Sequence, residues 1–227
     1  MAPLQFQCIQ KAMDSEGIHC EVLNNSGSEV AQLGLKYVHN DTCYPALLII
    51  GQFIDALNSG KYDLHHTALL ISQSGGGCRA SNYIKLLRKA LVKAGYGYIP
   101  VASINPTGLE SSSSLPLTLT LVRKLIACAF YGDEIAALRN QIIPYEVHPG
   151  QTEAWCNQWI HEIDVWMHEN KNYSIHAMKK IFVKIANDAK KIERKSEKKV
   201  KVGVVGEIFV KFSPLGNNGL QEFLEKE

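Results

Sequence analysis

The sequence predicts an α/β fold in which a parallel sheet carries helices on both faces, as in flavodoxin-like and Rossmann-like domains. Three observations predict it. Two short apolar runs with strand character, residues 67–72 and 98–104, alternate with longer segments of helical period. The loops between them are short and contain the turn formers Gly, Ser and Pro. The 227 residues are 46% hydrophobic and 20% charged, which is typical of a folded globular protein.

The first elements follow from apolar spacing and from residues that cap helices. Residues 6–13 have apolar positions at helical spacing, and Gly17 ends that helix. Residues 19–23 are predicted to be a short strand. A capping-box spacing at residues 26–29 begins a second helix. Residues 46–57 are apolar on nearly every side, so the helix there is expected to be buried.

The middle of the chain has the order strand, helix, strand, helix. The strand at 67–72 leads through a glycine-rich loop into a helix over residues 79–94. The strand at 98–104 leads into a helix over residues 117–140. Strands that are separated by a helix pair in parallel, so this order predicts a parallel sheet.

The character of the chain changes after residue 144. We expect an α/β domain over residues 1–144, and a helical segment over residues 145–199 that is broken near 170–173. The start of a second, truncated α/β unit follows over residues 200–227, with a buried strand at 201–206. A helix begins close to Met1 with no strand before it, so we expect an internal fragment of a longer protein.

Charge and hydropathy exclude several classes of protein. The net charge is +2, but residues 179–201 hold ten Lys and Arg against three acids. Apolar residues recur through this stretch at helical spacing, which predicts the basic face of an amphipathic helix rather than a nucleic-acid site. No apolar run is long enough for a membrane span, and no secretory signal is visible. The sequence therefore predicts a cytoplasmic protein that binds neither membrane nor nucleic acid.

Two of the six cysteines stand apart because each immediately precedes a predicted helix. They are Cys43 and Cys78. A helix N-terminus favours negative charge, which suits a thiolate ligand or nucleophile. Cys78 also follows the carboxyl end of a predicted parallel strand, where α/β sheets usually hold ligands. The alternative is that both are small residues in tight turns.

The remaining chemistry-bearing residues give weaker indications. Gly75, Gly76 and Gly77 could cradle a phosphate at a helix start, but a P-loop lysine is missing. They could equally bring backbone amides close to a cluster bonded to Cys78. The other four cysteines lie within predicted elements and are expected to be structural: Cys8, Cys20, Cys128 and Cys156.

Several stretches resemble the large CoA-substrate-specific enzyme activase proteins of anaerobes. The resemblance lies in the region related to 2-hydroxyglutaryl-CoA dehydratase subunits and double-cubane reductases, and it covers most of the chain. The stretches are LKYVHNDTCYPA at residues 35–46, GQFIDAL at 51–57, QSGGGCRASNY at 73–83, IPYEV at 143–147 and VGVVGEI at 202–208.

The resemblance implies an iron–sulfur segment of an ATP-driven, low-potential electron-transfer system. An ATPase activase module, in the same or a partner chain, would supply electrons, and an acyl-CoA would be the substrate. Cys43 and Cys78 match the two early ligands of a 4Fe–4S or double-cubane cluster. The third ligand is expected beyond Glu227, with Cys156 as a weaker substitute. Two thiolates would hold a cluster loosely, so we expect the isolated fragment to lose it and to be inactive.

Two other functions remain open at this point. The chain could be a cluster-free scaffold or docking domain of the same large protein. It could also be a CoA-binding or phosphate-binding module that uses Gly75, Gly76 and Gly77.

Overall fold

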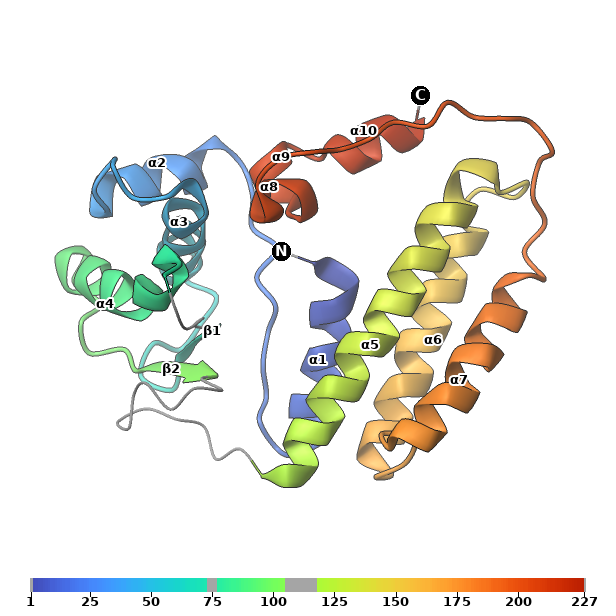
Figure 1. The fold of residues 1–227 in the computed structure, drawn as a ribbon. Coiled ribbons are helices and arrows are strands. Elements are labelled where there is room, and N and C mark those ends of the chain that lie inside the picture. The colour runs from blue at the N-terminus through green and yellow to red at the C-terminus, as the bar shows by residue number, and fades with distance from the viewer. Residues whose placement is uncertain (1, 73–76, 105–117, 227) are drawn as a thin grey trace. The chain divides into compact units, whose positions relative to one another are not determined.

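The predicted fold class is wrong, because the parallel sheet with helices on both faces is replaced by a mostly helical structure. The computed structural model describes residues 2–72, 77–104 and 118–226, and helices dominate them (Figure 1). Their strands amount to one parallel pair, 4% of the chain, against 62% helix. Every helix in these ranges is too short or too polar to cross a bilayer.

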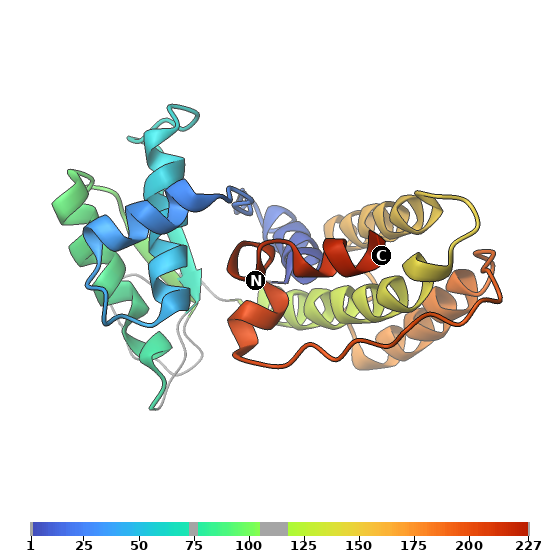
Figure 2. The ribbon, with the colours of Figure 1, turned by 90° about the horizontal axis from the view of Figure 1, so that it is seen from above.

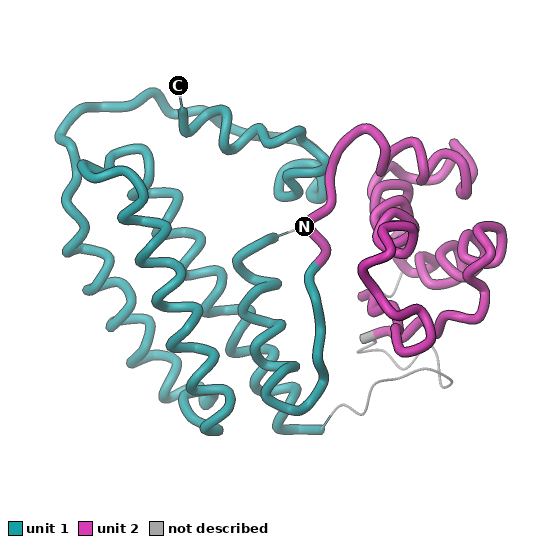
Figure 3. The backbone as a smooth tube through the Cα atoms, turned by 180° about the vertical axis from the view of Figure 1, so that it is seen from behind, with its two compact units in different colours: residues 1–22, 118–227 teal, residues 23–117 magenta. Residues whose placement is uncertain are grey.

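The chain divides into two compact units, which Figure 3 distinguishes by colour. Unit 1 consists of residues 1–22 and 118–227, and unit 2 of residues 23–117. The three predicted segments, 1–144, 145–199 and 200–227, do not coincide with these units. The first predicted segment supplies all of unit 2 and also two helices of unit 1.

Unit 2 contains the one strand–helix–strand arrangement that the sequence predicted. Its elements are α2 (Ser28–Tyr37), α3 (Tyr44–Asn58), β1 (Leu69–Ser72), the 3-10 helix η1 (Arg79–Asn82), α4 (Tyr83–Ala94) and β2 (Val101–Ile104). β1 and β2 pair in parallel, with Leu69 opposite Val101 and Ile71 opposite Ser103. All four of these residues are buried, and α3 and α4 contribute most of the remaining core. The parallel pairing is thus confirmed, but only for two strands.

Helices α2 and α3 approach each other closely because two glycines lie at their contact. A Cβ atom on Gly51 would overlap the carbonyl oxygen of Val30, and one on Gly34 would overlap that of Leu47. Glycine is needed at both positions because it alone lets the two backbones meet. This contact fixes the position of α3 within unit 2.

We expect Gly51→Ala to destabilise the protein by about 1–3 kcal/mol, the cost of overpacking a close contact. Alanine favours helix more than glycine does, so any loss must come from the overlap with Val30. Urea unfolding followed by circular dichroism measures the change. Gly203→Ala is the control, because open space surrounds Gly203 and its expected effect is within about 0.5 kcal/mol. A Gly51→Ala variant as stable as the wild type would contradict the packing.

Unit 1 is built on four helices that pack side by side (Figure 1). They are α1 (Pro3–Asp14), α5 (Leu119–Ile142), α6 (Gln151–His168) and α7 (Ile175–Ala189). Local signals set the starts of two of them: Thr118 caps α5 and Ser174 caps α7, each through its side-chain oxygen. α1 and α5 meet at Gly132, where a Cβ would lie 2.6 Å from the Cα of Gln5. The break between α6 and α7 falls at Asn170 to Asn172, as the sequence predicted.

Two predicted strands, residues 19–23 and 201–206, are irregular in the structure. Near the first, the amide of Cys20 donates to Asp14 and its carbonyl accepts from Gln10, so side chains of α1 take the place of a neighbouring strand. The second makes no backbone–backbone hydrogen bond with any described residue, and its Val205 is 90% exposed. Residues 200–227 therefore do not begin a second α/β unit in this structure.

The C-terminal elements are attached to the helices of unit 1 mainly by polar contacts. They are the short helices α8 (Ile208–Phe212), α9 (Pro214–Asn217) and α10 (Leu220–Lys226). The 3-10 helix η2 (Ile143–Tyr145) lies earlier in the chain and continues α5. Arg139 of α5 pairs with Glu153 of α6 at 2.6 Å and with Glu225 of α10 at 2.8 Å. This contact joins α10 to the C-terminal part of α5, and Figure 2 shows the two helices side by side.

One fully buried ammonium group lies at the contact between α5 and the end of α1. The Nζ atom of Lys124 donates to the carboxylate of Glu16 at 2.5 Å and to the hydroxyl of Ser15 at 3.0 Å. The Lys124 side chain is completely buried, and Glu16 retains partial exposure. A buried charge is tolerated only when it is paired, so this contact depends on both partners.

We expect Glu16→Gln to cost more stability than Lys124→Met. The first change leaves the buried ammonium unpaired, for a loss of about 2–4 kcal/mol, whereas the second removes the charge and keeps the volume. Urea unfolding of the two variants gives the order directly. Glu169→Gln is the matched control, because Glu169 pairs with Lys171 on the surface and its loss costs well under about 1 kcal/mol. Equal losses for Glu16→Gln and Glu169→Gln would contradict the role of burial.

Candidate thiolate site

Cys43 lies where the sequence placed it, directly before a helix. It is the N-cap residue of α3, and Pro45 follows in the first turn. Its side chain is half-buried, and the Sγ atom lies 3.1 Å from the hydroxyl oxygen of Tyr83. Tyr83 is the first residue of α4 and is itself buried. The thiol of Cys43 is therefore at the N-terminal end of α4 as well as of α3.

Cys78 precedes a 3-10 turn rather than an α-helix. It is the N-cap residue of η1, which continues into α4 at Tyr83. Its Sγ atom accepts a hydrogen bond from the amide of Ala80 at 3.5 Å, and its carbonyl accepts one from the hydroxyl of Ser81 at 2.7 Å. Cys78 is exposed. Cys43 thus contacts the side chain of the first residue of α4, and Cys78 precedes the 3-10 turn that leads into α4.

The glycine run is only partly described. Gly75 and Gly76 lie outside the described residues, so the predicted cradle cannot be built from them. Gly77 is exposed, and no atom lies within 4 Å of the position that a Cβ would take. Gly77 is therefore not required by packing against the described part of the chain.

Three of the other cysteines are buried together in the core of unit 1. Cys8, Cys128 and Cys156 come from α1, α5 and α6. Burial raises the pKa of both Cys8 and Cys156 to about 12, and it raises that of Cys128 as well. Such thiols stay protonated near neutral pH, and the expectation that they are structural agrees with their burial. The substitute ligand Cys156 is accordingly poorly suited to bind metal.

Cys20 is half-buried in unit 1 and lies 3.7 Å from the sulfur of Met13. Burial, together with the nearby charge of Asp14, raises its pKa. Among the described residues, no group of three or more His, Cys, Asp or Glu side chains could hold a metal ion. The candidate site therefore offers two sulfur ligands and no complete ligand set.

Sequence reasoning missed the residues that contact the two thiols. Tyr83 and Ala80 both belong to the stretch at residues 73–83 that carries the resemblance, but nothing in their spacing indicates a contact with sulfur. Only the packing of α3 against α4 places the Tyr83 hydroxyl on Cys43.

Comparison with protein-family models, curated proteins and solved structures gave no match for this chain. The grounds for the candidate site are therefore the contacts of its own residues.

The burial of the cysteines predicts the order in which iodoacetamide labels them in the folded protein. Cys78 should react first, Cys43 and Cys20 more slowly, and the three core cysteines only after unfolding. Iodoacetamide reacts with the thiolate, and the raised pKa values keep Cys8 and Cys156 protonated well above pH 9. Pulse labelling with peptide mapping by mass spectrometry measures each rate. Labelling of Cys156 as fast as Cys78 would show that the core of unit 1 is open.

Proposed function

We propose that unit 2 supplies thiolate ligands to an iron–sulfur cluster in a low-potential electron-transfer system of the 2-hydroxyacyl-CoA dehydratase and activase type. The resemblance of the quoted stretches suggests the chemistry. The observation that carries the proposal for this chain is that Cys43 contacts the first residue of α4 and Cys78 caps the 3-10 turn before α4, each with a hydrogen-bond partner on its sulfur.

The surroundings of both sulfur atoms fit ligation as thiolates. A thiolate can only accept hydrogen bonds, so the Tyr83 hydroxyl would donate to Cys43 and the Ala80 amide to Cys78. Hydrogen bonds of this kind orient metal-binding sulfur and tune the reduction potential of the cluster. A bound cluster would supply one-electron transfer at low potential, and the residues of unit 2 would hold it and set that potential.

The two thiols make an incomplete set for a cubane held by four cysteines. The other ligands must come from outside the described residues or from another molecule, since the described residues offer no third ligand nearby. The same proposal includes an activase module that hydrolyses ATP and supplies electrons, and an acyl-CoA substrate that accepts them. Unit 2 would contribute only ligands to the cluster.

Iron and acid-labile sulfide content after anaerobic reconstitution of the whole chain tests the proposal. The wild type should take up iron and sulfide and show the broad visible absorbance of an iron–sulfur centre. Cys43→Ser and Cys78→Ser should each lose most of both. Cys20→Ser is the matched control, because Cys20 is also half-buried but lies in unit 1, and it should keep the wild-type content.

Two results would contradict the proposal. Equal iron content in the wild type and in both serine variants would show that neither cysteine is a ligand. No iron in the wild type, with both variants as stable as the wild type, would favour the cluster-free scaffold. Thermal stabilisation by CoA that survives Cys78→Ser would favour the CoA-binding or phosphate-binding module instead.

A further inference from the structure

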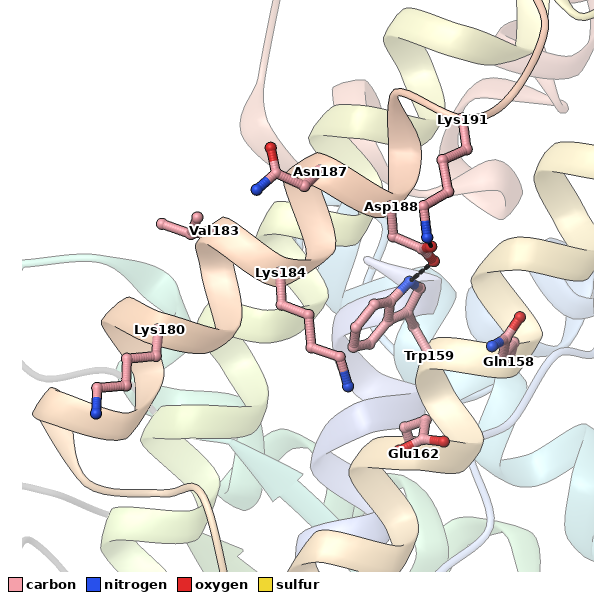
Figure 4. A pocket seen from close by; sticks show the side chains of 9 residues that line it. All are labelled: Gln158, Trp159, Glu162, Lys180, Val183, Lys184, Asn187, Asp188 and Lys191. Atoms are coloured by element: carbon pink, nitrogen blue, oxygen red, sulfur yellow. Dashed lines mark hydrogen bonds and ion pairs between the residues drawn. The ribbon is translucent and has the colours of Figure 1, made fainter.

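Unit 1 contains a groove between α6 and α7 that is lined by residues other than cysteine (Figure 4). Its volume is about 450 Å³. Trp159 forms the floor and is almost completely buried. One wall comes from α7 and the other from α6, and the side chains of these walls are Lys180, Val183, Lys184, Asn187, Asp188 and Lys191, with Gln158 and Glu162 opposite.

The α7 wall carries two lysines on one face of the helix. Lys180 and Lys184 are four residues apart, which places them one turn apart on that face, and Lys191 lies just beyond the end of α7. Val183, between Lys180 and Lys184 along the helix, exposes 61% of its surface. The groove therefore combines positive charge with exposed apolar surface.

Only part of the positive charge is neutralised within the chain. Asp188 pairs with Lys191 at 2.9 Å and accepts a hydrogen bond from the indole nitrogen of Trp159 at 3.1 Å, so its carboxylate is fully engaged. The Lys184 ammonium lies over the rings of Trp159 and Trp166, 5.3 and 5.9 Å from their centroids. Neither Lys180 nor Lys184 has a carboxylate partner among the described residues, and both side chains are exposed.

We propose that this groove binds an acidic amphipathic helix of a partner protein. Two carboxylates one turn apart on that helix would pair with Lys180 and Lys184, and an apolar side chain between them would cover Val183 and the edge of Trp159. A third helix laid between two others is a common mode of recognition, and its charge here must oppose that of α7. The proposal does not depend on the cluster.

The lining of the groove favours an acidic helix over nucleic acid. Trp159 is only 3% exposed, so it offers little ring surface on which a base could stack. Glu162 places a carboxylate on the α6 wall, so the acidic side chains of the partner helix must lie against α7. Most of the other basic side chains of residues 179–201 lie outside the groove, so charge alone does not locate the site.

Fluorescence anisotropy with a labelled synthetic peptide of about 18 residues, long enough to form a helix, tests the proposal on the whole chain. The peptide carries Glu at positions one turn apart, with Leu on the same face. The double variant Lys180→Glu/Lys184→Glu should bind it about tenfold more weakly than the wild type. The matched control Lys179→Glu/Lys190→Glu changes the same charge on α7 and its C-cap, at residues that do not line the groove, and should change binding by less than about twofold.

A peptide with Lys in place of Glu should bind the Lys180→Glu/Lys184→Glu variant and not the wild type, which also shows that this variant is folded. Four results would overturn the proposal. They are no binding by the wild type, equal loss in the two double variants, equal binding of a peptide with Gln in place of Glu, and tighter binding of a labelled DNA duplex than of the peptide.

Discussion

Within each unit, close contact between helix backbones sets how the helices pack. In unit 2 this packing determines where the thiol of Cys43 lies. With only two strands in the described residues, unit 2 has no broad sheet on which helices can be arranged. The glycines at the contact of α2 and α3 let α3 sit against α2, and α4 then packs on α3. This stacking brings the Tyr83 hydroxyl to the Cys43 sulfur. The site at the end of α4 is thus a consequence of a steric constraint some distance away along α3.

The sequence predicts most helices of this fold because their signals are local. Apolar spacing and glycines at helix ends operate within a few residues, so α1, α3, α5 and α6 could be predicted within a few residues of their ends. The end of α7 was missed, because the helical segment was expected to continue to residue 199 and α7 ends at Ala189. A β-strand needs a second strand to pair with, and that strand can lie far away in the sequence. The valines at residues 202–205 have the pattern of a buried strand, but in the structure they lie in solvent without one. The prediction of a larger parallel sheet was wrong for this reason.

The candidate sites divide in the same way. Cys43 and Cys78 could be predicted to lie at helix starts, since a cap is read from the residues that follow it. Their hydrogen-bond donors could not be predicted, because α3 and α4 meet only through tertiary packing. The lysines of α7 were visible as a basic helix face, but the groove also needs Trp159 of α6 beneath it. The sequence predicts that these lysines lie on an exposed helix face, but only the packing of α6 and α7 shows that a groove lies beside them.

The attachment of the C-terminal helices has a consequence for how the protein opens. Among the described residues after 207, Phe209 is the one large apolar side chain that is buried, and Arg139 provides the ionic contact to Glu225. The side chains of this ion pair are 15% and 16% exposed, so salt screens it less than a surface pair. With so little apolar burial, we expect this segment to open locally, below the free energy of global unfolding. Its amides would then exchange with solvent while those of α5 stay protected.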